Sequence, residues 1–294
     1  MCSAVFDKGV QFPRALFNMF LNEFICNLRK CNSGCSINGR FVGAIMYADD
    51  LIILSPTVAG LQKLLACCEI TSKELFLEFN CKKCHCIAIG PASKCTITGM
   101  SLSNYIISWT DAFQYLGVNF IANKKLMVDI NPIKRKFFVA CNSILGKAKC
   151  LNDIIKLSLM ESYCLPILSY ATVAMKLTHA QICDLNACWN SVYRRIFGFN
   201  KWESVRLFIH GMGRLDFCHL RDYLRLKFFS CGMVSKNVLY AYVMKRLFFS
   251  DVFKESCRDT GLRVSSHKQF ISIPCGVFKK AVHLTFADTC AIYM

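Results

Sequence analysis

The fold of this chain is decided by residues 41–54, which read Phe-Val-Gly-Ala-Ile-Met-Tyr-Ala-Asp-Asp-Leu-Ile-Ile-Leu. Two short apolar runs flank the adjacent carboxylates Asp49 and Asp50, and turn-forming residues bound the whole stretch at Gly39 and Ser55-Pro56. This pattern predicts two strands joined as a hairpin, with the acidic pair at its tight turn. Because successive side chains on a strand point to opposite faces, only a turn would aim both carboxylates at one ligand.

Two neighbouring carboxylates offer the hard oxygen ligands that Mg²⁺ chemistry on phosphates requires. Taken alone, the Asp49-Asp50 dipeptide is better explained as a solvated hairpin tip that carries two charges. The residues on both sides of the pair reverse that interpretation.

The sequence Tyr47-Ala48-Asp49-Asp50 between apolar strands resembles the active-site hairpin of reverse transcriptases. With Ala in second place, and with Leu51-Ile52-Ile53-Leu54 after it, it is most similar to the non-LTR, or LINE-type, retrotransposon branch. The resemblance implies an RNA-directed DNA polymerase with Mg²⁺ as cofactor. Its partners would be an RNA template, a DNA primer and dNTPs. Asp49 and Asp50 would be catalytic metal ligands, with Asp49 dominant, and Tyr47 and Ala48 would bind the nucleotide.

Upstream of the hairpin, Gly9-Val10 precedes a helix that carries Leu16-Phe17-Asn18, in the order of another motif of this family. The connecting loop is about four residues shorter than the family pattern. By resemblance, Gln11 would lie beside the incoming nucleotide; an ordinary polar residue of a loop explains it equally well.

Two further family segments follow the hairpin. Asn80-Cys81-Lys82-Lys83 corresponds to the Asn-x-x-Lys segment, and this implies that Lys83 protonates the leaving pyrophosphate. A solvated loop lysine is the alternative. Tyr115-Leu116-Gly117 matches the hairpin that binds the primer end, where Gly permits a close backbone approach.

Local signals predict several other elements. Thr57 should cap a helix that ends at Phe79-Asn80. The family resemblance implies a strand at residues 85–89, after the Asn-x-x-Lys segment. The predicted helices of the second part cover Leu151 to Leu177, His179 to Phe197 and Leu215 to Phe229, the second ending at a Gly198 cap.

Charge is distributed unevenly along the chain. Residues 1–123 hold 10 Lys and Arg against 8 Asp and Glu, whereas residues 124–294 hold 26 against 11. Such asymmetry favours a surface that faces phosphates. The residues predicted to bind nucleic acid are Lys134, Arg135, Lys136, Arg194 and Arg195. The solvated cationic face of core helices explains each of them individually.

The 20 cysteines are irregularly spaced, and we find no secretory signal in residues 1–11, so we expect reduced core residues and an intracellular protein, cytoplasmic or nuclear. A zinc site at Cys81–Cys86 is disfavoured because its ligands are crowded and lack a second half-site. The longest apolar stretch, Ser158 to Lys176, is interrupted by Glu161 and Pro166, so we expect no membrane span.

The polymerase family uses a third metal-binding carboxylate on an upstream strand, and only residues 1–8 precede Gly9. We therefore expect a truncated reverse transcriptase without fingers, with an unpaired palm edge, inactive unless another chain complements it. The alternatives are a non-catalytic nucleic-acid-binding remnant and a degenerate product. The predicted fold class is α+β: a partial palm of antiparallel strands and helices over residues 1–123, then a basic, all-helical, thumb-like region over 124–294.

Overall fold

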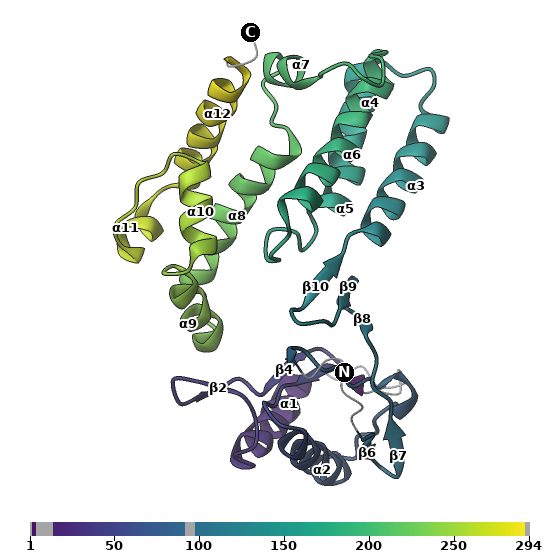
Figure 1. The fold of residues 1–294 in the computed structure, drawn as a ribbon, viewed down its shortest axis with the longest axis vertical. Helices are drawn as coiled ribbons and strands as arrows, with labels where there is room; N and C mark the ends of the chain where they lie inside the picture. The colour runs from purple at the N-terminus through teal and green to yellow at the C-terminus, as the bar shows by residue number, and fades with distance from the viewer. Residues whose placement is uncertain (1, 4–13, 92–97, 292–294) are drawn as a thin grey trace. The chain divides into compact units, whose positions relative to one another are not determined.

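A computed structural model describes residues 2–3, 14–91 and 98–291 of the chain (Figure 1). The chain divides into two compact units, residues 1–126 (unit 1) and residues 127–294 (unit 2), close to the predicted boundary. Short antiparallel strands and two long helices make up the described part of unit 1, and helices dominate unit 2. The predicted α+β class is confirmed.

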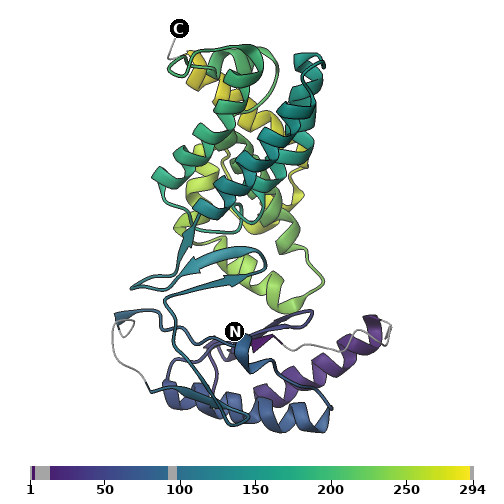
Figure 2. The ribbon, with the colours of Figure 1, turned by 90° about the vertical axis from the view of Figure 1, so that its right-hand side faces the viewer.

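The central sheet of unit 1 holds three antiparallel strands in the order β1-β5-β4: β1 (Cys2–Ser3), β5 (Asp50–Ile53) and β4 (Ala44–Tyr47). The helices α1 (Arg14–Lys30) and α2 (Val58–Glu74) pack against each other and against this sheet (Figure 1 and Figure 2). The core between them consists of buried side chains from all three layers: Phe24, Leu28, Ala44, Leu51, Leu64 and Cys68.

The sequence predicted a palm edge left unpaired by the missing upstream strand, and this is not found at the edge of β5. Strand β1 pairs with β5, with Cys2 opposite Leu51 and Ser3 opposite Asp50. The short segment at the start of the chain therefore occupies the edge beside the acidic pair, because an exposed edge gains backbone hydrogen bonds from any strand that reaches it.

Three other hairpins complete the described strands of unit 1, each with a two-residue turn in which both residues have positive φ. This is the arrangement of type I′ turns, which match the twist of the flanking strands. Asn38-Gly39, predicted as a turn, is one of them. The hairpins are β2 (Ser36–Ile37) with β3 (Arg40–Phe41), β6 (Met100–Leu102) with β7 (Tyr105–Ile107), and β8 (Ala112–Tyr115) with β9 (Val118–Ile121).

The strand predicted at residues 85–89 does not form. This segment follows the 3₁₀ helix η1 (Cys81–Lys83) and makes a single bridge, between Cys86 and Trp109. Only Cys86 of this segment is buried, where it packs with Met100, Leu102 and Ile107, while Ile89 is 50% exposed. The strand that the family pattern implies is therefore reduced to one bridge.

Helix α2 begins as predicted and ends earlier. The Thr57 hydroxyl accepts a hydrogen bond from the Gly60 N–H at 3.1 Å. The helix stops at Glu74, and Phe76 adopts a left-handed φ of +54° with 96% of its surface exposed. The Leu77 N–H returns to the Ser72 carbonyl at 2.8 Å, which closes a Schellman-type turn where glycine is normally preferred.

Phe76→Gly should therefore stabilise the protein by about 1 kcal/mol. A left-handed conformation costs an L-residue roughly 1–2 kcal/mol, and glycine avoids this cost. The greater freedom of glycine in the unfolded chain offsets part of the gain. Urea denaturation would measure the change. Phe76→Ala is the matched control, since it removes the same exposed ring and keeps the strained backbone. Equal stability of the two variants would contradict this account.

Unit 2 starts with β10 (Met127–Asp129) and continues as helices, none of which, within the part of the chain that the structure describes, is long and apolar enough to cross a bilayer. They are α3 (Asn131–Lys147), α4 (Asp153–Leu159), the π-helical turn η3 (Met160–Cys164), α5 (Leu165–Ser169), α6 (His179–Phe197), α7 (Arg206–Gly211), α8 (Phe217–Met233), α9 (Val238–Leu247), α10 (Asp251–Asp259), α11 (His267–Ser272) and α12 (Cys275–Ala291).

Helix α6 has the predicted bounds because its ends are locally encoded. Thr178 and Gln181 form a capping box, and Gly198 ends the helix with a φ of +74°. The helix predicted from Leu151 to Leu177 instead ends at Ser169, where Tyr170 turns to an extended ψ of 124°. Apolar residues beyond Ser169, such as buried Leu177, lie in a loop and still contribute to the core. The apolar spacing typical of a helix therefore extends past the end of the helix.

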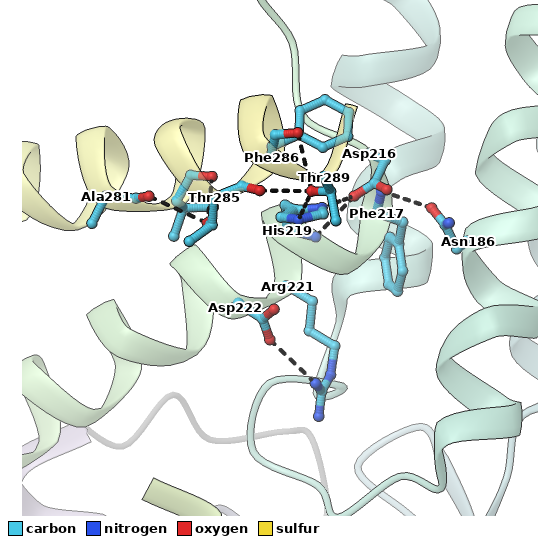
Figure 3. A network of polar contacts seen from close by, with 11 residues as sticks. Asn186, Asp216, Phe217, His219, Arg221, Asp222, Ala281, Thr285, Phe286 and Thr289 are labelled. Carbon is cyan, nitrogen blue, oxygen red and sulfur yellow. Dashed lines mark hydrogen bonds and ion pairs between the residues drawn. The ribbon is translucent and has the colours of Figure 1, made fainter. Parts of the chain in front are cut away.

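A buried polar network joins three helices of unit 2 (Figure 3). The Asp216 carboxylate caps α8 by accepting from the His219 N–H at 2.9 Å, and it lies 2.6 Å from His219 Nδ1. His219 Nε2 lies 3.4 Å from the Thr289 hydroxyl of α12, and the Asn186 side chain of α6 accepts from the Phe217 N–H at 3.0 Å. These contacts fix the start of α8 between its neighbours.

Arginine side chains are also buried in α8. Arg221 and Arg225 are 4% and 6% exposed, and Arg221 Nη1 lies 3.6 Å from the Asp222 carboxylate (Figure 3). Burial raises the pKa of Asp222 to about 6, against an ordinary 3.8, although the Arg221 charge opposes the shift. The folded state therefore binds a proton at Asp222 more readily than the unfolded chain does.

Because the pKa of Asp222 is raised on folding, its contribution stabilises the fold at low pH and is lost as pH rises from about 4 to 6. Unfolding free energies of wild type and Asp222→Asn, measured in urea at pH 4 to 7, should show this. The difference between the two should shift in favour of wild type by roughly 2 kcal/mol on acidification. A difference in unfolding free energy that does not change with pH would contradict the raised pKa of Asp222.

Candidate functional site

The acidic hairpin pairs Tyr47 of β4 with Asp50 of β5, and Ala48-Asp49 form its two-residue turn. Ala48 has a φ of +49°, whereas Asp49 does not have positive φ, so this turn differs from the three type I′ hairpins of unit 1. A left-handed alanine costs roughly 1–2 kcal/mol, and backbone strain of this kind tends to collect at functional sites.

The two carboxylates occupy different positions. Asp49 lies in the turn and is exposed, while Asp50 is the first residue of β5 and is half-buried. The prediction that both lie in the turn is therefore wrong for Asp50, because β5 begins one residue earlier than expected. Neither carboxylate has a hydrogen bond or ion pair to any residue that the structure describes, so their oxygens are free to bind a cation.

Strand alternation gives the hairpin two chemically distinct faces. Ala44, Met46 and Leu51 point to the α1–α2 side and join the core there. Ile45, Tyr47, Asp50 and Ile52 share the opposite face. Asp50 is thus carried on the face of the sheet that α1 and α2 do not cover.

The β8–β9 hairpin lies beside that face. Tyr115 lines a cavity of about 230 Å³ together with Ile45 and Ile52, and Phe113 and Phe120 line the same cavity. The Phe113 and Phe120 rings stack at 5.1 Å across the β8–β9 ladder and stiffen it. Burial raises the pKa of Tyr115, and the nearby negative charge of Asp50 and the phenol of Tyr47 raise it further. The structure therefore brings Tyr115 together with Tyr47 and Asp50.

The other predicted residues of unit 1 lie apart from this group or outside the description. Leu116 and Gly117 form the left-handed turn of the β8–β9 hairpin. Lys83 is exposed at the end of η1, and the structure gives its amine no hydrogen bond or ion pair to Asp49 or Asp50. Gln11 lies outside the described residues.

The predicted nucleic-acid contacts of unit 2 fall into two groups. Three have protein partners: Lys134 pairs with Asp184 at 3.0 Å, Arg194 donates to the Glu203 carbonyl at 2.9 Å, and Arg195 donates to Asn142 at 2.8 Å. Arg135 and Lys136 are exposed on α3, and neither has an ion-pair partner within the described ranges.

Two features of the site were missed from the sequence. The strain at Ala48 has no local signal, since alanine is not a turn residue. The approach of Tyr115 to Asp50 joins segments far apart in the chain. The alternation of Phe113 and Tyr115 on one face of a predicted strand was the available hint.

Comparison with known proteins finds a family match in unit 1. Residues 3–120 match the family described as reverse transcriptase (RNA-dependent DNA polymerase). This segment, which contains the acidic hairpin and Tyr115, is similar to reverse transcriptases.

The relatives include proteins of R2 retrotransposable elements, and the chain spans only about an eighth of the length of these. The chain is 29% identical over 135 residues to the Pol polyprotein of the R2 element of Nasonia vitripennis, covering 42% of this chain and 13% of that protein. It is 29% identical over 134 residues to that of element R2DM of Drosophila melanogaster, covering 42% and 12%. An uncharacterized transposon-derived protein of Caenorhabditis elegans is 27% identical over 180 residues, covering 59% and 63%.

The proximity of Asp50 and Tyr115 can be tested in solution. Asp50→Asn removes a negative charge beside the phenol and should lower the pKa of Tyr115, measured by NMR titration of ¹³Cζ-labelled tyrosine with Tyr115→Phe for assignment. Glu69→Gln is the control, because Glu69 lies on α2 and bonds Lys73 and Ser103. An unchanged Tyr115 pKa in Asp50→Asn would show that Asp50 and Tyr115 are not close to each other in solution.

Proposed function

We propose that unit 1 is the metal-binding and primer-binding part of a retrotransposon reverse transcriptase palm, which serves template-directed DNA synthesis on RNA. The observation that carries this proposal is the hairpin with two carboxylates that have no partner among the described residues, together with Tyr115 near Asp50. The partners would be an RNA template, a DNA primer and dNTPs, inside the cell.

The residues at the hairpin fit Mg²⁺. Asp49 and Asp50 supply hard oxygen atoms without competing protein cations, and adjacent like charges gain from a cation between them. In this role Asp49 and Asp50 would hold the ions. Bound Mg²⁺ would favour ionisation of the primer 3′-hydroxyl and neutralise charge on the phosphates.

The protein side chains would orient the reactants. Tyr47 and Ala48 flank the carboxylates and would contact the nucleotide, while Tyr115, Leu116 and Gly117 would position the primer end through their turn. Lys83, exposed on η1, would reach the triphosphate only if the bound substrate lies over that edge, and would then protonate the leaving pyrophosphate.

The site as described offers two carboxylates, and no cluster of three potential metal ligands is found among the residues that the structure describes. We propose that the third carboxylate comes from an upstream palm strand on the longer protein or on a complementing chain. This chain by itself would then be inactive.

A second function, nucleic-acid binding without catalysis, is favoured by a separate observation. Arg135 and Lys136 are exposed on α3 and have no ion-pair partner among the residues that the structure describes, in a unit whose net charge is strongly positive. Unpaired surface cations release counterions when they meet phosphates, so such binding would fall steeply with salt.

Primer extension on an RNA template with Mg²⁺ distinguishes these functions. The chain alone should give no product, and adding a polypeptide that carries the upstream palm strand and its carboxylate should restore extension. Asp49→Ala should reduce the restored activity at least about a hundredfold, because it removes a metal ligand.

Salt-dependent RNA binding by the chain, measured in parallel, should survive Asp49→Ala. Binding without extension in every mixture would favour the non-catalytic function. Extension that persists in Asp49→Ala would exclude this hairpin as the metal site.

A further inference from the structure

A basic hollow in unit 2 lies outside the segment that matches the reverse transcriptase family. Its lining residues come from the end of α9, one flank of α10 and the segment before α11, and its volume is about 520 Å³. Pockets that hold ligands the size of a nucleotide fall between about 300 and 1,000 Å³. The hollow is therefore large enough to admit a nucleotide.

The floor of the hollow is part of the packed core. Phe248, Phe253 and Cys257 are 6%, 3% and 7% exposed, and Leu262 and Val264 pack beside them. Phe249 stands at the rim with 70% of its surface exposed. The Phe249 and Phe248 rings are arranged edge to face with their centroids 5.3 Å apart, so the buried ring restrains the exposed one.

Three cations line the same hollow: Lys254, Arg258 and Arg263. Lys254 and Arg258 are one helical turn apart on α10, so they project from the same flank. All three are exposed, and none has an ion-pair partner within the described part of the chain.

Backbone geometry at the end of α10 brings the third cation to the hollow. Gly261 has a φ of +65°, its N–H donates to the Arg258 carbonyl at 3.0 Å, and the Leu262 N–H donates to the Cys257 carbonyl at 2.9 Å. This is a Schellman motif, which reverses the chain sharply. Arg263 is thereby returned to the wall that Arg258 lines.

The acidic residues of α10 offset these charges only in part. Glu255 and Asp259 act electrostatically on Arg221 and Arg225, which are buried in α8, and Asp259 also interacts with Arg258. Asp251 is one helical turn from Lys254 on the same flank, but it has no ion pair with the three cations among the described residues. Three cations around one hollow keep it net positive, and this charge is complementary to an anion.

We propose that this hollow is a binding site for single-stranded nucleic acid. Lys254, Arg258 and Arg263 would contact successive phosphates, and a base would stack on Phe249. Combined cations and exposed aromatics are the usual means of binding single strands, because every base offers a π-face once it is unpaired. A duplex keeps its base faces covered, and its convex surface would leave the Phe249 ring without a stacking partner. The site does not depend on the activity of the acidic hairpin.

The test is fluorescence anisotropy of the full chain with labelled 15-nucleotide oligo(dT) and oligo(U), at several salt concentrations. Lys254→Gln/Arg258→Gln should weaken binding about tenfold or more and flatten the salt dependence by the loss of two phosphate contacts. Lys279→Gln/Lys280→Gln, two exposed lysines of α12, is the charge-matched control and should change the affinity less than about twofold.

The aromatic contact is tested separately. Phe249→Leu should weaken binding several-fold, while Phe249→Tyr, which keeps the ring, should bind like wild type. Photocrosslinking with a 4-thiouridine oligonucleotide should label the tryptic peptide of residues 247–254. Asp49→Ala should leave all of these results unchanged, so failure of the polymerase proposal would not affect them.

Three results would overturn the proposal. One is equal weakening of oligonucleotide binding by Lys254→Gln/Arg258→Gln in the hollow and by the control double variant, which would indicate nonspecific attraction to a cationic protein. Another is preference for a 15-base-pair duplex over the single strand. The third is binding through this hollow to phosphatidylserine vesicles, with no effect of its variants on oligonucleotide affinity.

Discussion

The structure of unit 1 depends on the two-residue period of the β4–β5 hairpin. Ala44, Met46 and Leu51 bury one face against α1 and α2, and this fixes which side chains appear on the other face. A slip of one residue would bury Asp50 and expose Leu51, which is 1% exposed. The apolar core therefore determines where the carboxylates are presented, although none of its side chains takes part in the chemistry.

The hairpin also concentrates two unfavourable features, a left-handed Ala48 and two adjacent like charges. Both are tolerated because the flanking strands are held on several sides: by β1 on the edge of β5, by the two helices below, and by the β8–β9 hairpin near Tyr115. A turn optimised for stability would place Gly at the position of Ala48, the first central residue with positive φ. The strain and the repulsion are what a cation-binding function would explain.

Sequence reasoning succeeded where the chemistry is local. Thr57, Gly198 and Asn38-Gly39 each determine a helix end or turn through residues a few positions away, as predicted. It failed where distant packing decides. Phe76 ends α2 in a conformation that its side chain disfavours, and Cys86 is buried without becoming a strand. The carboxylates could be identified from their motif, but Tyr115 beside Asp50 required the fold.

The charged residues of unit 2 likewise show what sequence alone cannot predict. A count of Lys and Arg cannot separate cations that already have partners from those that remain free, and the predicted set contained both. Lys134, Arg194 and Arg195 are held by protein acceptors. Arg214 makes a two-point ion pair with Glu161, and its Nε lies 2.6 Å from Glu161 Oε1. Arg221 and Arg225 are buried. Cations with protein acceptors have little left to offer a phosphate, because moving them would leave those acceptors unpaired. Binding of nucleic acid by unit 2 would therefore rest on exposed cations that have no ion-pair partner among the described residues, and in the hollow beside α10 such cations stand next to an exposed aromatic ring.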